Sequence, residues 1–457
     1  MNDKVPGKIK LRYGIGDMGV AMLTAITQFF LMIYYTDVAL IDPAIVGSAL
    51  MVGKLTWDAV NDPLFGYLSD RTKTRWGRRR PYLLFGAVPL ALGTWILFSI
   101  PKGLTGVSAF LVVLFSFLLF DTIHSIVSVN YSAMTPEMSQ DYDERTSITT
   151  IREIFTVVGY ILGAATTTVV AGLFMSKFNM NEHAAYSGMG LFFGLIAMAA
   201  VFVTAFGVKE KPNAVIPAKI PPFKAVASTF KNKPFMWLMG CFLLTNFSFT
   251  LLTTLLPYYL TYQLGMADQI PIVMISMLGS IGLFLYPMKL LTDRIGKGPA
   301  YAAGLGLAAL ACAATFLLPQ GPSPLIYVIG VVAGMGFSAQ WVCPWSMLPD
   351  VVEYDELKTG QRQEGIYYGM WNFITKFTNA FGIAVAGWSL ALFGYVANVE
   401  QTSRALFGIR FFFGPVSAIV IFIALPLLIW YPITRKSHMK LLEELAAKRA
   451  QKEAPAE

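Results

Sequence analysis

Three ionisable side chains interrupt an otherwise apolar stretch of the sequence, in the segment KLTWDAVNDP at residues 54–63. Lys54, Asp58 and Asp62 are spaced four residues apart, so on a helix they share one face, with Asn61 close by. Two carboxylates in apolar surroundings repel each other and lose solvation, so they need a compensating charge. A bound hard cation such as Na⁺, or a proton held on one carboxyl, would supply it. A static pair of Lys54 and Asp58 is the alternative, but it leaves Asp62 unexplained.

Another ionisable group lies deep in a second apolar run, GMWNFITKFTNAFG, roughly eleven residues from the start of that run. At 1.5 Å per residue, Lys376 is then about 16 Å deep, near the middle of a bilayer. A lysine at that depth must face a cavity or a carboxylate, and we expect it to face the acids of segment 54–63. A lysine that extends to the membrane surface is the alternative. Asp121 and His124 share a face of a third run, either as a substrate or proton site or as a local hydrogen-bonded pair.

Long apolar runs must position all of these residues. Of the 457 residues, 55% are hydrophobic and only 14% are charged, whereas soluble domains carry about 25% charged residues. About twelve runs approach the roughly 20 residues that cross a bilayer. They lie near residues 14–36, 45–69, 80–100, 108–133, 150–175, 186–208, 234–263, 270–292, 299–319, 324–350, 365–393 and 407–432. The sequence therefore predicts an all-α polytopic membrane protein with twelve transmembrane helices.

The longest polar interval, residues 207–233, divides these runs into six and six. DRTKTRWGRRRP follows the second run and DRIGKG follows the eighth, which makes a weak internal repeat. Two related six-helix halves are the mark of a large class of secondary transporters, whose sites lie near the midplane. We expect a first half, a cytoplasmic central loop, a second half and a cytoplasmic tail, at residues 1–208, 209–233, 234–432 and 433–457.

Positive charge in the loops predicts the orientation of the chain. Lys and Arg gather at both termini, in the loop after the second run and in the central loop. These parts are expected on the cytoplasmic side of a plasma membrane. The net charge of +8 fits loops at an anionic lipid surface and not nucleic-acid binding. The pattern of the tail predicts a short amphipathic helix followed by a disordered end.

Nucleotide-binding and enzyme motifs are absent from the sequence or lie out of context. GIGDMG at residues 14–19 matches GxGxxG, but no strand precedes it, so small residues at a membrane helix contact explain it better. Asp17 in this stretch is expected near a helix start, where it would cap the helix. No GxxxxGK[ST] or HExxH motif occurs. We therefore expect no cofactor, no enzymatic activity and no ATP-driven transport.

Longer motifs carry a resemblance to a known family. They are FLMIYYTD, WDAVNDPLFGYLSDRTKTRWGRRRPYLLFG, NYSAMTPE with DERTSITTIR, and MLPDVVEYDELKTGQRQEG leading to Lys376. Over nearly its whole length the chain resembles the major facilitator superfamily, in particular the glycoside–pentoside–hexuronide:cation symporters. VGKLTWDA, FDTI and PWSMLPD are also similar to the sodium-dependent lysophosphatidylcholine symporters, a sister branch.

The resemblance implies roles for individual residues. Asp58 and Asp62 match the cation site of the symporter family, so they are the metal ligands if the coupling ion is Na⁺. Ser128 stands where the melibiose carriers have a helix-IV acid that completes this site, which leaves the choice of ion open. Arg152 matches an arginine of the sugar pathway, and Lys376 matches a functional lysine of helix XI. The galactoside site of those carriers is not preserved in this sequence.

A glycoside would need aromatic faces and hydrogen-bonding groups in a wet cavity. With Lys376 and Arg152, the candidates for substrate contact are Asp121, Tyr131, Trp341, Trp345, Tyr368, Trp371 and Asn372. The three tryptophans are explained equally well by packing or by interfacial belts. Charged residues at the cytoplasmic ends of two helices are expected to latch the outward-open state through ion pairs. They are Asp70, Arg71, Arg79, Asp350 and Glu353.

The function expected from the sequence is cation-coupled symport of a sugar or glycoside, driven by Na⁺ or H⁺, by a monomer whose halves alternate in access. Symport of a lysophospholipid by the same fold is the alternative, because apolar residues are abundant everywhere. A receptor or channel built on the same fold is a remoter alternative, since fold does not fix function.

Overall fold

The computed structural model describes residues 4–139, 142–208, 229–359 and 364–453. A few side chains inside these ranges, that of Asp58 among them, lie outside the description. Throughout the described ranges the elements are helices, apart from one isolated bridge between Thr74 and Gly77. The prediction of an all-α fold is therefore confirmed.

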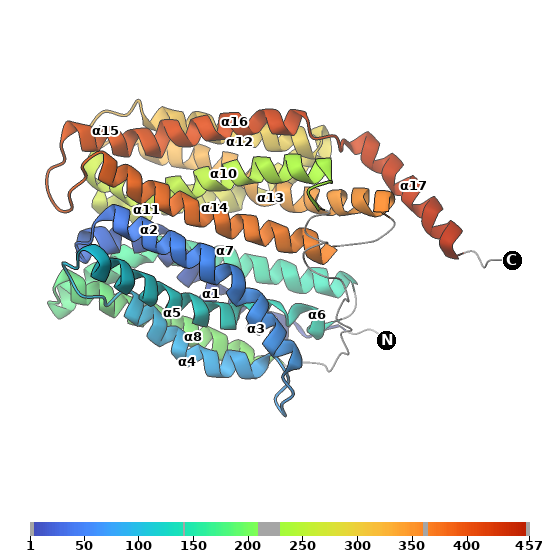
Figure 1. Cartoon of the computed structure of the whole chain (residues 1–457), viewed down its shortest axis with the longest axis horizontal. Coiled ribbons are helices and arrows are strands. Elements are labelled where there is room, and N and C mark those ends of the chain that lie inside the picture. Colours follow the sequence, from blue (N-terminus) through green and yellow to red (C-terminus); the bar gives the residue numbers. More distant parts are fainter. Residues whose placement is uncertain (1–3, 140–141, 209–228, 360–363, 454–457) are drawn as a thin grey trace.

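The first half of the bundle contains six long helical passages (Figure 1). They are α1 (Gly7–Ile33) with η1 (Tyr34–Val38); α2 (Pro43–Gly53), η2 (Lys54–Asp58) and α3 (Ala59–Arg71); α4 (Arg80–Leu97); α5 (Gly106–Ser132); α7 (Tyr142–Phe178); and α8 (Glu182–Gly207). The short helix α6 (Thr135–Met138) connects α5 to α7.

The second half repeats this arrangement after the central loop, most of which lies outside the described residues. Its passages are α10 (Lys233–Tyr258) with η3 (Tyr259–Gln263); α11 (Ile270–Ile295), preceded by η4 (Ala267–Gln269); α12 (Lys297–Thr315); α13 (Leu325–Thr359); α14 (Glu364–Leu392); and α15 (Ser403–Phe411), η5 (Phe412–Val416) and α16 (Ser417–Ile429). The tail forms α17 (Arg435–Glu453).

Ten of these passages are long and apolar enough to cross a membrane by length and composition alone. The other two long passages of the described chain are the second, at residues 43–71, and the eleventh, α14. They carry Lys54, Asp58 and Asp62, and Lys376, whose polar side chains lower the hydropathy of both helices. The two passages that are not among these ten are thus the ones that carry the candidate site.

Small residues let helices approach closely inside the first half. A Cβ at Gly159 or Gly163 of α7 would collide with the backbone carbonyl oxygen of Met18 or Met22 on α1. On α1 itself, a Cβ at Gly16 would collide with Thr204 of α8. The interpretation of GIGDMG as a helix contact is therefore confirmed, because close backbone approach in a membrane depends on such residues.

The two halves are joined at the end of the bundle that lies opposite both termini, which we call the distal end (Figure 1). Gly47 of α2 packs against the backbone of α14 at Ala384 and Gly387. Nearby, Trp388 Nε1 donates to Ser48 Oγ across the halves at 2.9 Å. The end that holds both termini is called the terminal end below.

A buried carboxylate completes the distal closure. Asp37, only 8% exposed, belongs to η1 of the first half. It accepts hydrogen bonds from the hydroxyls of Tyr262 and Tyr395 in the second half, the latter at 2.6 Å. Its backbone oxygen accepts from Asn398 Nδ2 at 2.7 Å. Thr36 next to it shares a hydrogen bond of 2.6 Å with the Tyr258 hydroxyl.

The tail helix packs on the second half. Leu441 and Leu445 of α17 are buried, while Met439, Lys440 and Leu442 are exposed. The predicted tail helix is present, but the exposed Met439 and Leu442 show that its apolar residues are not gathered on one face. The predicted disordered end falls on residues 454–457, which lie outside the described residues.

Candidate functional site

The second passage is not a continuous α-helix at the ionisable segment. Lys54–Asp58 forms a π-helical turn between α2 and α3. Pro63 follows inside α3, and its missing N–H removes one backbone hydrogen bond from the next turn. The expected four-residue stripe along a regular helix is therefore corrected: the π turn changes the register between Lys54 and Asp62. Such turns occur often at functional sites.

Lys376 and Asp62 form an ion pair between the two halves. Lys376 Nζ lies 2.5 Å from Asp62 Oδ2, and the two side chains are 24% and 35% exposed. The expected contact between Lys376 and an acid of the second passage is thus present. Lys54 takes a different direction, with its Nζ 5.0 Å from the centre of the Phe117 ring. The side chain of Asp58, predicted as a cation ligand, lies outside the described residues.

Asn61 faces α5 and not the ion pair. It is 1% exposed, and its Nδ2 lies 3.3 Å from the Asp121 backbone oxygen and 3.4 Å from Asp121 Oδ2. Its Oδ1 is buried without a hydrogen-bond partner among the described atoms. An unpaired buried oxygen beside a carboxylate suits a hard cation, which prefers such ligands.

Asp121 of α5, the fourth passage, is the acid that contacts the second passage. Ser128, predicted as a cation ligand, is half-buried on α5 two turns further along. Asp121 was expected as a substrate contact or as a partner of His124. Asn61 donates to the Asp121 backbone oxygen and side chain, and His124 Nε2 lies 3.3 Å from Thr24 Oγ1 of α1. The expected roles of Asp121 and His124 stay predictions. The structure thus adds Asp121 to the polar group of the second passage.

Arg152 faces α1 from α7. Its Nε lies 3.6 Å from Asp17 Oδ2, and its Nη2 lies 2.6 Å from Glu153 Oε1. Asp17 also accepts a hydrogen bond from the Thr156 hydroxyl. Because α1 begins at Gly7, the expectation that Asp17 caps a helix was wrong. This carboxylate instead orients Arg152.

Three of the four candidate aromatic residues of the second half, Trp345, Tyr368 and Trp371, lie next to one another on α13 and α14. Trp345 lies 6.0 Å from the buried Trp371 and 6.5 Å from Tyr368 between ring centroids. Trp371 also packs on Phe242 at 4.1 Å, which favours packing for this tryptophan. Trp345 is exposed, as is Asn372 one turn from Lys376.

Tyr131 is placed in helix packing and not beside the other candidates. Its ring stacks on Tyr13 at 4.5 Å, and its hydroxyl donates to the Tyr13 backbone oxygen at 2.6 Å. Tyr13 returns a hydrogen bond of 2.9 Å to the Tyr131 oxygen. Tyr131 is 1% exposed, so this geometry corrects the expectation of a substrate contact.

Replacing Tyr131 by phenylalanine is expected to destabilise the protein by about 1 kcal/mol, the usual contribution of one such hydrogen bond. The affinity for substrate should stay unchanged, because the ring keeps its stack on Tyr13. Thermal unfolding and a substrate titration of the purified variant check both points. A weakened affinity with unchanged thermal stability would return Tyr131 to the substrate contacts.

A layer of amide and aromatic side chains between the halves was missed by the sequence reasoning. Gln28 of α1 accepts a hydrogen bond of 2.5 Å from Tyr160 and donates one of 3.2 Å to Thr253 of α10. The Tyr160 ring meets the edge of Trp341 across the halves at 5.9 Å. Within the second half, Asn246 of α10 donates hydrogen bonds to Thr378 and Asn379 of α14. Amides inside apolar runs are the signal that would have found Gln28, Asn246 and Asn379.

The predicted gating residues have partners in their own halves. Arg79 pairs with Asp70, and Arg71 lies over the Tyr67 ring. Asp350 Oδ2 lies 2.6 Å from Lys297 Nζ of α12, and Glu353 Oε2 lies 2.8 Å from His438 Nε2 of the tail. The proposed latch between halves belongs to the outward-open state and stays a prediction.

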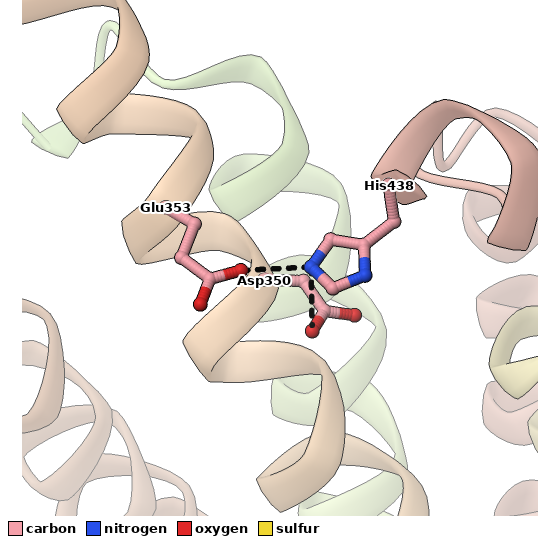
Figure 2. A group of neighbouring side chains, drawn as sticks. All are labelled: Asp350, Glu353 and His438. Atoms are coloured by element: carbon pink, nitrogen blue, oxygen red, sulfur yellow. Dashed lines mark hydrogen bonds and ion pairs between the residues drawn. The ribbon is translucent and has the colours of Figure 1, made fainter. Parts of the chain in front are cut away.

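Asp350, Glu353 and His438 also make a group that could hold a metal ion (Figure 2). Both oxygens of Asp350 already accept from Lys297, at 2.8 and 2.6 Å. The His438 ring nitrogen occupies the space between the two carboxylates (Figure 2). Because Lys297 and His438 satisfy these acids, the group fits a tail contact better than a metal site.

Two six-helix halves, an ion pair between them and a polar layer inside an apolar bundle define a membrane carrier of the major facilitator type. A family model described as MFS/sugar transport protein matches residues 12–435, and the chain belongs to this family. It is therefore a membrane transporter and not an enzyme.

Both sugar and lysolipid transporters are among the relatives with a named substrate. An isoprimeverose transporter of Lactiplantibacillus pentosus is 27% identical, over 99% of this chain and 94% of that one. Sodium-dependent lysophosphatidylcholine symporter 1 of Gallus gallus is 26% identical, over 95% of this chain and 89% of that one. The crystal structure of a bacterial homolog of the human lysosomal transporter Spinster shares the fold, with a TM-score of 0.70 at 12% identity, covering 96% of this chain and 97% of that one.

Proposed function

We propose that the protein is a cation-coupled symporter of a sugar or glycoside, with both termini in the cytoplasm. The observation that carries the coupling is the ion pair of Lys376 with Asp62 at the meeting of the halves. When a cation binds to Asp62, it breaks the ion pair with Lys376. The ammonium of Lys376 can then donate hydrogen bonds to substrate. By linkage, substrate bound to Lys376 favours the cation by the same factor.

The polar layer supports a hydroxyl-rich substrate. Gln28, Asn246 and Asn379 offer amide donors and acceptors, and Trp341 offers an apolar face of the kind that packs on a sugar ring. These groups come from α1, α10, α13 and α14, so a ligand among them contacts both halves. Rocking of the halves would then expose it to each side in turn. The similarity to an isoprimeverose transporter agrees with this choice.

Lysophospholipid symport is the second candidate. It is favoured by Asp121 of α5, which belongs to the FDTI stretch similar to the lysophosphatidylcholine symporters and lies beside Asn61 of the second passage. The similarity to a lysophosphatidylcholine symporter over most of both chains supports it as well. Such a substrate would need a polar pocket for its headgroup and an apolar slot for its tail.

Thermal stability of the purified monomer against a panel of glycosides and lysophospholipids tests the proposal. Each ligand is added in Na⁺ and in K⁺, at two pH values, because a ligand that binds the folded state raises its melting temperature. We expect a shift with a glycoside that is larger in Na⁺ or that depends on pH. A shift with lysophospholipids alone would replace the sugar assignment.

Uptake into proteoliposomes then separates a carrier from a receptor or channel. A symporter gives saturable accumulation that collapses with the cation gradient. Ligand binding without accumulation would overturn the transport assignment itself.

A further inference from the structure

A cavity of about 940 Å³ lies at the terminal end of the second half, away from the contact between the halves. The ends of α11, α12 and α16 form its walls together with the start of the tail helix α17. Four of the side chains that line it are basic, namely Arg294, Lys297, Arg435 and Lys436. Apolar residues, Leu428, Ile429 and Ile433 among them, line another part.

The positive charge of this cavity is only partly compensated. Lys297 is paired with Asp350, and Asp293 is paired with Lys289 at 3.3 Å. Arg435 donates to a backbone oxygen, that of Asp293, at 2.9 Å. Within the described residues, Arg294 and Lys436 form no ion pair. The cavity therefore presents cationic groups that an anion would stabilise.

The position of the cavity favours a lipid anion. It opens where three apolar passages end, at the level where a bilayer places its headgroups. Ile429 is 79% exposed beside it, and Ile295 and Trp430 are exposed on the same helix ends. Exposed aliphatic side chains with a tryptophan at a helix end are typical of a membrane–water interface.

The tail helix builds one wall of the cavity. His438 of α17 contacts Glu353 and Asp350 of α13 (Figure 2). This contact fixes the start of the tail helix, so that Arg435 and Lys436 line the cavity beside the end of α11. A basic wall brought together with an apolar wall suits a ligand that has an anionic head and hydrocarbon chains. Basic pockets between membrane helices bind anionic headgroups in this way.

We propose that this cavity binds an anionic phospholipid, with the phosphate headgroup between Arg294, Arg435 and Lys436 and the acyl chains along Ile429. Bound lipid would also fasten the tail to the second half. The site is separate from the transport pathway, so it stands whether the transported substrate is a glycoside or a lysophospholipid.

The test compares binding of phosphatidylglycerol and phosphatidylcholine of equal chain length to the full-length protein, by native mass spectrometry in detergent. We expect phosphatidylglycerol to bind more tightly to the wild type. In the double variant Arg294→Gln/Lys436→Gln its affinity should fall about 25-fold, since each basic group near an anionic lipid contributes roughly a fivefold factor. The matched control is Lys8→Gln/Lys440→Gln, which removes the same charge from exposed residues outside the cavity. Its affinity for phosphatidylglycerol should equal that of the wild type.

Equal binding of the two lipids by the wild type would overturn the proposal. An equal loss in the control variant would also overturn it, because bulk charge would then explain the preference. Glycerol 3-phosphate is the third ligand. If it protects the protein against thermal unfolding as strongly as phosphatidylglycerol does, the site takes a soluble phosphate and the lipid assignment is wrong.

Discussion

The variant Lys376→Gln is expected to bind the coupling cation about tenfold more tightly than the wild type, because the ammonium no longer competes for Asp62. Charged groups in direct contact are coupled by roughly 0.5–3 kcal/mol, and tenfold corresponds to about 1.4 kcal/mol. Asp62→Asn should abolish the response to the cation altogether. The double variant should behave like Asp62→Asn, since both lack the carboxylate for which Lys376 and the cation compete. The readout is the cation dependence of the melting temperature without substrate, which keeps substrate binding by Lys376 out of the measurement.

Two further variants serve as controls for this set of single and double variants. Lys376→Arg keeps the positive charge and should keep the wild-type cation affinity. Lys358→Gln removes a lysine that lies over the Tyr354 ring and should change nothing. If the ion pair is only structural, both single variants lose stability, the double variant recovers it, and the cation response persists throughout. That pattern would remove Asp62 from the cation site.

The sequence predicted the features that depend on hydropathy and depth. The apolar runs gave the passages, because a bilayer imposes a minimum length on each. The depth of Lys376 indicated a carboxylate partner, because an unpaired charge near the midplane is costly. The Lys376–Asp62 ion pair agrees with that argument.

Features that depend on backbone register and on helix rotation could not be predicted in this way. The π turn at Lys54–Asp58 changes which side chains share a face, yet no side-chain pattern encodes it. Asn61 was grouped with Asp58 and Asp62 by spacing, but the rotation of α3 turns it toward Asp121. Gln28 and Thr253 lie in different halves of the chain, so only tertiary packing shows that they meet between the halves.

Closure at one end and the ion pair at mid-depth belong to one conformational cycle. The halves pack closely at the distal end, where Gly47 and Gly387 bring α2 and α14 together. A carrier must break this closure to reach its other state, so the contacts there set the free-energy difference between the two states. Among the described side chains, Asp37 is the only charged group that joins the halves at this end. We therefore expect its replacement to change the free-energy difference between the two states more than any other contact there.

Replacing Asp37 by alanine is expected to shift the equilibrium toward opening of the distal end by roughly a hundredfold. The substitution removes the hydrogen bonds from Tyr262 and Tyr395, and bonds to a charged group contribute about 1.5–3 kcal/mol each. Loss of about 3 kcal/mol corresponds to a factor of roughly 150. Tyr395→Phe removes one bond and keeps the ring, so about a tenfold shift is expected.

Spin labels at Val107 and Leu317 report this opening. Both positions are exposed, at the distal ends of the first and the second half respectively. Pulsed electron paramagnetic resonance should show an additional, longer distance between the labels in Asp37→Ala. The same longer distance should appear in Tyr395→Phe with a smaller population. Asp42→Ala is the matched control, because Asp42 caps α2 at the same end and its carboxylate, among the described residues, bonds only the backbone of its own half. If Asp37→Ala keeps the wild-type distribution, or if Asp42→Ala changes it equally, the carboxylate of Asp37 does not hold the halves together.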